Sequence, residues 1–361
     1  MKKILFLASL AAVAMTSCTS ESNEYVGGND NTPKEIAFMP LAQKATRANA
    51  FSPFSETAFP DNYTMEVSAN LNGGGVYFSD VLFSKGEGTT WKGGQYWPLS
   101  ACTLNFLAVT NWTTTPTSVV STAFTDGAKQ ATVTLGNNQP TDLTAPSAQT
   151  GAQHDLMYAV GRGIVSQSTA ISYTGNEAGD AAPVDMIFKH ALAWVNFTVK
   201  TNASYTGFKL RYIKLLNAYY GGTYTLDNTT NYNYAYDGST YNSRTATAIT
   251  GTWSSPTNQG ASIAVPGWTG ASTDLTTTPV PVGNGLVVVP TNGITPATNS
   301  FTGFEIGYTF NGQDFTYTYS NNVVLEQAKK YTYAINFTLT EIEINPSVTD
   351  WGAGSGADIT I

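Results

Sequence analysis

The side chains that most often carry out catalysis are sparse in this sequence, which has two histidines in 361 residues. His154 stands next to Asp155, but neighbouring side chains on extended backbone point in opposite directions, so the two form a poor catalytic dyad. His190 lies in an apolar stretch, where a structural, hydrogen-bonded role is expected. Glu341 and Glu343 would share one strand face, where paired carboxylates usually form a solvated surface that resists aggregation.

Motifs and charge narrow the possible functions further. The sequence has no serine nucleophile elbow, zinc-protease motif, phosphate-binding loop or paired-cysteine motif. It carries 25 acidic and 17 basic residues, a formal net charge of −8, without a basic cluster that would bind nucleic acid. The sequence predicts a protein that is not an enzyme, uses no cofactor or metal, and does not bind nucleic acid.

One thiol lies in a context that favours covalent modification. Two lysines precede an apolar run over residues 4–15, which is too short to span a bilayer, and small residues then lead to Cys18. This arrangement resembles a bacterial lipoprotein signal, in which the cysteine thiol is lipidated. The sequence predicts a signal peptide over residues 1–17 and lipidation of Cys18, with an ordinary secretory peptide cleaved near Ser17 as the alternative.

A second candidate site of covalent modification is a loop open to proteolysis that follows a short N-terminal strand. Residues 20–33 are a polar linker, and residues 35–41 form a short strand with Ile36 and Phe38 on one face. Pro40 cannot donate to a ladder, so this strand is expected to lie at a sheet edge or to stop there. The small, polar residues that follow surround Lys44 and Arg47, which predicts an exposed loop open to proteolysis.

Strands dominate the rest of the chain. Alternating apolar residues and turn residues predict strands at 63–67, 76–83, 103–109, 118–124, 184–200, 208–217, 286–290, 304–310, 315–319 and 331–339. Residues 91–98 read as a turn between aromatic anchors. At Thr340 the apolar alternation changes phase, which predicts a bulge or a change of sheet. The pattern is all-β, with two β-sandwich domains divided at residues 201–207.

Tyrosines offer a candidate binding surface. Tyr219, Tyr220, Tyr224 and the alternating tyrosines at 232, 234 and 236 could stack on sugar rings. The alternative is that they line a sheet face or contact another subunit.

Several separate stretches together resemble one family, the fimbrillin-type (type V) pilins of Bacteroidales. They are the leader that ends at Cys18, EIAFMPL followed by KATRA, DLMYA at 155–159, IFKHALAWVNFTV, LEQAKKYTYAINFTL and PSVTDWG. The resemblance covers nearly the whole chain. It implies two transthyretin-like Greek-key β-sandwich domains in tandem, over residues 48–203 and 204–361, behind a removable segment over residues 18–47.

The resemblance also implies an assembly mechanism. A lipidated precursor reaches the outer membrane, and a protease cuts between Arg47 and Ala48, which removes the strand that carries Ile36, Phe38 and Leu41. The groove left behind would accept a donor strand from another subunit. That donor would be the tail over residues 352–361, with Ile359 and Ile361 as groove fillers and residues 352–356 as hinge.

The implied product is a stalk of identical subunits in an extracellular fimbrium that supports adhesion, with accessory or anchor subunits and a processing protease as further partners. One alternative is an accessory or tip subunit. Another is an uncleaved, lipid-anchored surface adhesin, including one that binds glycans. The tail could equally be an ordinary final strand of its own sandwich.

Overall fold

The structure, a computed structural model, describes residues 34–42, 61, 64–71, 75–86, 88–111, 120–125, 130–135, 155–167, 171–174, 183–227, 251–257, 263–265, 267–291, 301–350 and 359–360. In these ranges the regular elements are 22 strands and the short 3-10 helix η2 (Gly270–Ser272). The expected all-β fold is therefore confirmed. Within the same ranges, no helix is long and apolar enough to cross a bilayer.

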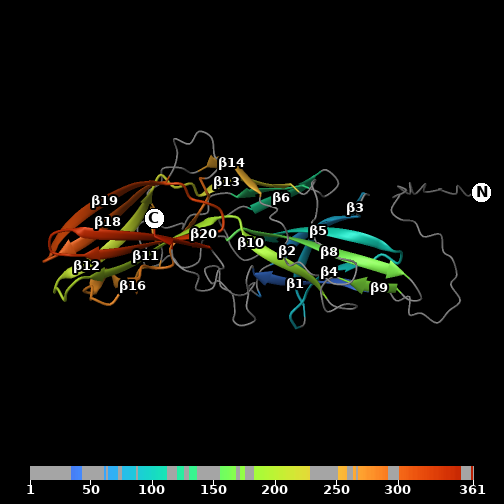
Figure 1. Ribbon diagram of the computed structural model, residues 1–361, viewed down its shortest axis with the longest axis horizontal. Helices are drawn as coiled ribbons and strands as arrows, with labels where there is room; N and C mark the ends of the chain where they lie inside the picture. Colours follow the sequence, from blue (N-terminus) through green and yellow to red (C-terminus); the bar gives the residue numbers. More distant parts are fainter. Residues whose placement is uncertain are drawn as a thin grey trace, which may run out of the picture.

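The N-terminal lobe is built on one eight-stranded sheet (Figure 1). In spatial order its strands are β10 (Val184–His190), β1 (Glu35–Ala42), β4 (Trp91–Tyr96), β3 (Val76–Lys85), β2 (Thr64–Leu71), β5 (Cys102–Asn111), β8 (Met157–Gln167) and β9 (Ile171–Thr174). β10 also pairs with β8, so the sheet closes on itself around its core.

The C-terminal lobe, at the opposite end of Figure 1, has two sheets. One contains β16 (Val280–Pro281), β11 (Ala193–Thr201), β20 (Lys329–Phe337), β21 (Ile342–Asp350) and β22 (Ile359–Thr360), with β17 (Leu286–Val288) beside β11. The other contains β15 (Ile263–Ala264), β12 (Phe208–Leu216), β18 (Phe301–Phe310) and β19 (Gln313–Val323).

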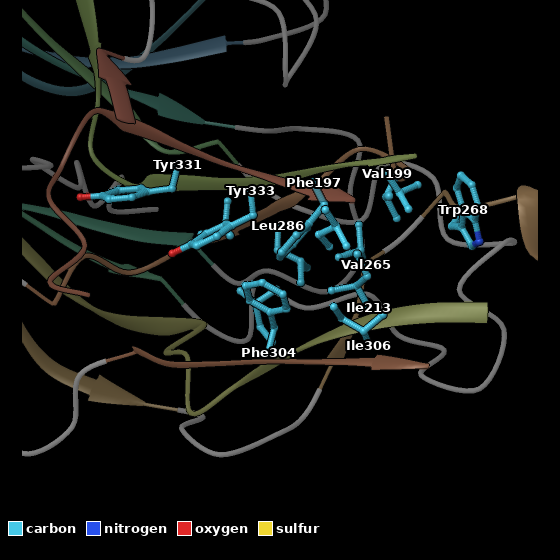
Figure 2. Close-up of a cluster of buried hydrophobic side chains, with 14 of the residues drawn as sticks. Phe197, Val199, Ile213, Val265, Trp268, Leu286, Phe304, Ile306, Tyr331 and Tyr333 are labelled. Atoms are coloured by element: carbon cyan, nitrogen blue, oxygen red, sulfur yellow. The ribbon is translucent and has the colours of Figure 1, made fainter. Parts of the chain in front are cut away.

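The apolar alternation of these strands builds the core between the two sheets (Figure 2). Phe197 of β11 meets Phe304 of β18 edge-on, with ring centroids 4.8 Å apart. Tyr333 of β20 stacks on Phe197 at 5.6 Å. The residues predicted to face inward on β11 and β20 are buried, as expected.

A fourth sheet joins the two lobes. Its strands are β6 (Val120–Thr125) and β7 (Gln130–Leu135), followed in space by β13 (Gly221–Asp227) and β14 (Thr252–Thr257). β7 and β13 pair antiparallel across the boundary between the halves of the chain. We call these four strands the junction sheet; they lie above the middle of the molecule in Figure 1.

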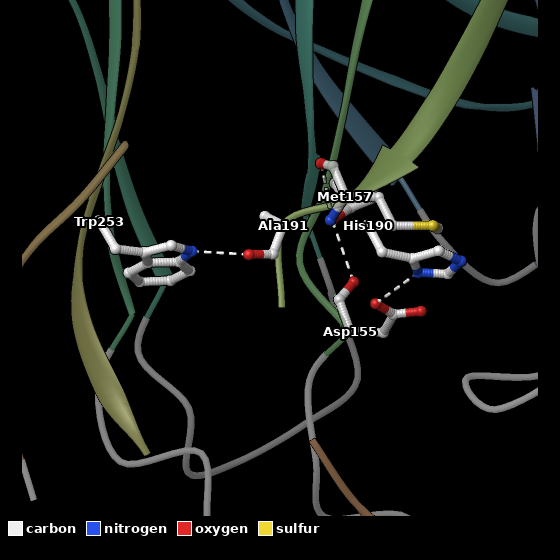
Figure 3. Close-up of polar contacts among 6 residues, drawn as sticks. Asp155, Met157, His190, Ala191 and Trp253 are labelled. Atoms are coloured by element: carbon white, nitrogen blue, oxygen red, sulfur yellow. Dashed lines mark hydrogen bonds and ion pairs between the residues drawn. The ribbon is translucent and has the colours of Figure 1, made fainter. Parts of the chain in front are cut away.

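The junction sheet covers a core of its own, made by residues of both lobes. Trp253 of β14 donates a 2.6 Å hydrogen bond from its indole N–H to the carbonyl of Ala191 (Figure 3). The hydroxyl of Tyr224 accepts hydrogen bonds from the Gly251 N–H and from the Gln327 amide, both at 3.0 Å. The Ala191 contact connects the junction sheet to the chain between β10 and β11, and the Gln327 contact connects it to the chain between β19 and β20.

Two details differ from the sequence expectations. Residues 91–96 form strand β4 instead of a turn. The phase change near Thr340 is a hairpin turn within one sheet, because β20 and β21 are antiparallel and Phe337 lies opposite Ile342. In this turn the Thr338 hydroxyl accepts the N–H groups of Thr340 and Glu341 and donates to the Glu341 carbonyl.

The predicted division between residues 203 and 204 remains a prediction. The strands stop pairing within the N-terminal lobe and begin pairing within the C-terminal lobe at an earlier point in the chain. β10 pairs with β1 and β8, whereas β11 pairs with β20 along its length and contributes to the C-terminal core. Partners therefore change at Ala191–Leu192, between β10 and β11.

Candidate functional site

The first strand of the structure, β1, lies inside the N-terminal sheet. It runs parallel to β10 from Phe38 to Ala42 and antiparallel to β4 from Glu35 to Phe38. The expectation that the strand lies at a sheet edge or stops at Pro40 is therefore wrong for β1 as a whole, which is internal and continues to Ala42. The physical reason is local, because the pairing with β4 ends at Phe38, and at Pro40 only β10 runs alongside.

Two side chains of β1 are fully buried in the N-terminal core, Ile36 and Phe38. The Phe38 ring meets Phe83 and Phe106 edge-on, with centroids 4.8 and 5.0 Å away. The backbone of Leu41 pairs with Ile187, while its side chain lies outside the described part. Ile36 and Phe38 thus occupy the places that the sequence predicted for this strand.

The start of β1 is held by polar contacts to β4 and the residue after it. One carboxylate oxygen of Glu35 accepts the Gly94 N–H at 3.1 Å, and the other lies 3.2 Å from the Lys92 ammonium. The carbonyl of Lys34 accepts the Trp97 N–H at 2.9 Å. These contacts are near the surface, where an ion pair contributes about 0–1 kcal/mol. They position the strand more than they stabilise it.

Removal of β1 would change the sheet in two ways. Burial of an Ile or Phe side chain stabilises a fold by roughly 1.5–3 kcal/mol, so the apolar contribution of Ile36 and Phe38 would be lost. Backbone groups of β10 and β4 that now pair with β1 would lose their partners, which creates two open strand edges. A slot of this kind can be filled by another extended segment.

The tail of the chain pairs with its own lobe. In the short strand β22, Ile359 lies opposite Val348 and Thr360 opposite Ser347 of β21. This pairing matches the alternative in which the tail is a final strand of its own sandwich, over two residues. The predicted filler Ile361, the hinge, Cys18, Arg47 and Ala48 lie outside the described residues, so their roles stay predictions.

The histidine expected to be structural is confirmed in that role. His190 Nδ1 lies 3.0 Å from a carboxylate oxygen of Asp155, and both side chains are buried (Figure 3). Burial raises the pKa of the Asp155 carboxyl, and His190 offsets part of this rise. The pairing of residues 35 positions apart could not be inferred from the sequence, which set Asp155 beside His154; His154 lies outside the described residues.

The tyrosines considered for sugar stacking are of two kinds. Tyr219, Tyr220 and Tyr224 are buried, so their rings are closed to a ligand and that interpretation is wrong for them. Tyr224 instead contacts Tyr158 and Trp253 in the core under the junction sheet. The tyrosines at 232, 234 and 236 lie outside the described residues. Within the described ranges, no three acidic, histidine or cysteine side chains gather as metal ligands do.

Solved structures similar to this chain include three proteins of Bacteroidales. A candidate cell adhesion protein from Bacteroides uniformis shares 17% identity, with 88% of this chain and 99% of that one covered, at a TM-score of 0.45. The tip fimbrial protein Mfa3 of Porphyromonas gingivalis shares 11% identity, with 88% of this chain and 100% of that one covered, at a TM-score of 0.39. The fimbrial anchor protein Mfa2 of the same organism shares 11% identity, with 88% of this chain and 98% of that one covered, at a TM-score of 0.33.

Comparison with families of known sequence gives the stronger result. No curated protein matches the chain. The fimbrillin-like family matches residues 69–351, well over half of the 361 residues. The chain therefore belongs to the fimbrillin-like family, whose members are structural and not enzymatic proteins.

Proposed function

We propose that the protein is a structural subunit of surface fimbriae, the pilus stalk, and that it polymerises by donor-strand exchange to support adhesion. In this proposal the two lobes are transthyretin-like β-sandwich domains, with β1 as a removable part of the first. The observation that carries the proposal is the position of β1. It is an internal strand with two fully buried side chains, and it is the first strand in the part of the chain that the structure describes.

The proposed sequence of events begins at the outer membrane. The precursor is anchored through lipid on Cys18, and a protease with specificity for arginine cuts between Arg47 and Ala48. β1 then leaves, and the lipid leaves with it. Because β10 and β4 each lose a pairing partner, the open slot favours insertion of an extended strand.

The donor in this proposal is the tail of a second copy. Its Ile359 and Ile361 are two residues apart, as are the buried Ile36 and Phe38 of β1. Side chains two positions apart on a strand point to the same face, so both isoleucines can enter the core. Reburial of two such side chains, worth roughly 1.5–3 kcal/mol each, together with a restored ladder would hold the copies together.

The test uses the full chain in cells that display it. Arg47→Ala should leave a lipidated monomer, and deletion of residues 357–361 should leave a processed subunit that forms no SDS-resistant ladder. Lys44→Ala is the matched control and should assemble normally. N-terminal sequencing of protein sheared from cells should begin at Ala48. Ladders that persist in both altered forms would reject the proposal.

A second candidate is an accessory or tip subunit, or an uncleaved lipid-anchored adhesin. The pairing of β22 with β21 of the same chain favours it, since a tail kept in its own sandwich donates nothing. This candidate predicts a blocked, lipid-modified N-terminus on the mature protein. It also predicts that the tail deletion leaves the protein's place in the fimbria unchanged.

A further inference from the structure

We propose that Asp358 of the incoming tail pairs with Lys92 of the receiving copy, and that this pair makes the donor run in the same direction as β1. The inference rests on the proposed donor-strand exchange. It begins with a likeness between two short stretches of the chain. Residues 35–38 read Glu-Ile-Ala-Phe, and residues 358–361 read Asp-Ile-Thr-Ile. Each has an acid, an aliphatic residue, a small residue and an apolar residue in that order.

Before cleavage, Lys92 on the receiving side of the slot already contacts a carboxylate of β1. Glu35 lies 3.2 Å from the Lys92 ammonium and accepts the Gly94 N–H at 3.1 Å. Loss of β1 removes this carboxylate and leaves a cation at the mouth of an apolar slot. An aspartate is one methylene shorter than a glutamate. The long, flexible Lys92 side chain can follow it, whereas the Gly94 N–H is fixed in the backbone.

The apolar positions fit the same alignment. With Asp358 in the place of Glu35, Ile359 takes the buried position of Ile36 and Ile361 that of Phe38. A shift by one residue in either direction would turn both isoleucines to the outer face, and in one direction it would also bury the aspartate, which is strongly unfavourable. A shift by two residues would bring Asp358 to position 37, directly in register with Lys92. A shift by two residues the other way would leave the Phe38 position empty, so both registers that fill it keep the Asp358–Lys92 pair.

A reversed strand does not fit as well. With both isoleucines in the two buried positions, reversal would move Asp358 to position 39, in register with the acidic residue Asp185 of β10. Reversal could still bring Asp358 to Lys92, but only by giving Ala357 the large position of Phe38. The charges and the apolar positions agree only for a donor parallel to β10 and antiparallel to β4, as β1 is.

The first test is a charge exchange in the full chain, read as the rate at which processed subunits form SDS-resistant ladders. Asp358→Lys and Lys92→Glu should each slow ladder formation by up to about fivefold, the upper range of a partly exposed charge pair. The double variant should return to within about twofold of the wild type. Lys209→Glu, a charge reversal of similar exposure in the C-terminal lobe, should match the wild type.

The second test is chemical. Zero-length carbodiimide cross-linking of wild-type fibres, followed by peptide mapping, should join the Lys92 amine to the Asp358 carboxyl of another copy. A link to the C-terminal carboxylate instead would overturn the proposed direction. Single variants that assemble like the wild type, or a double variant no better than either single one, would also overturn it. If wild-type ladders do not depend on the tail at all, the proposed function itself fails.

Discussion

Phe38 packs edge-on against Phe83 with ring centroids 4.8 Å apart, and it is fully buried. Phe106 closes the other side at 5.0 Å. A residue of the first described strand thus supplies a ring at the centre of the N-terminal core. The strand that carries this ring is the one that the proposed cleavage would release, so the stability of the precursor depends on a segment that the mature subunit would lack.

Phe38→Ala should destabilise the precursor strongly. Truncation of a buried phenylalanine typically lowers the free energy of unfolding by about 3–5 kcal/mol, because apolar contact is lost and a cavity remains. Urea denaturation of the uncleaved chain measures this loss. Met39→Ala, on the same strand and only half-buried, should cost far less. Equal losses for the two variants would contradict the role of Phe38 in the core.

Ile361→Phe should make assembled fibres more resistant to heat, if the tail fills the slot of β1. Isoleucine is smaller than the phenylalanine whose place it would take, so the larger ring should bury more apolar area between Phe83 and Phe106. The temperature at which ladders dissociate in SDS measures the effect. Thr360→Phe adds the same bulk to the opposite face of the strand and should bring no gain. A gain from both changes would show that hydrophobicity alone, not the slot, is responsible.

Tyr224→Phe and Tyr220→Phe should differ although both rings are buried. The Tyr224 hydroxyl accepts two hydrogen bonds, from the Gly251 N–H and the Gln327 amide, and its loss should cost about 1–3 kcal/mol. The Tyr220 hydroxyl has no hydrogen-bond partner among the described residues, so its removal should be neutral or stabilising. Thermal or urea unfolding compares the two, and similar losses would refute the assignment.

The buried Asp155 should make stability depend on pH. Its pKa is raised from the usual 3.8, chiefly by burial, so the folded state holds the proton more tightly than the unfolded state. The stability from this carboxyl is therefore present below the usual pKa and lost as the pH rises through the raised one. The advantage of the wild type over Asp155→Asn should shrink as the pH is increased from about 4 towards neutrality. Urea midpoints that differ by a constant amount at every pH would contradict this.

Sequence alternation predicted which faces of the strands are buried. Val195, Phe197 and Val199 on β11 are buried as expected, as are the inward residues of β20. The alternation works because successive side chains on a strand point to opposite faces. The structural role of His190 also followed from its apolar setting, although its partner Asp155 did not.

The errors came where distant segments decide the structure. Gly93 and Gly94 suggested a turn, but a Cβ atom on Gly93 would lie 2.8 Å from the Leu82 carbonyl oxygen, so glycine there permits close approach of β3 to β4. Pro40 suggested an edge, but β4 pairs with the first half of β1 while β10 pairs with the second, which makes the strand internal. Local sequence carries no signal for such pairings, nor for the composite junction sheet.

The junction sheet has a consequence for the modularity of the chain. Two of its strands come from the first half of the chain and two from the second, and β7 pairs with β13 over six residues. Neither half completes that sheet alone. A chimera that joined the first half of this chain to the second half of a relative would have to preserve the β7–β13 register and the fit of Tyr224 and Trp253. The two lobes should therefore be exchanged between relatives only as a pair, and not one at a time.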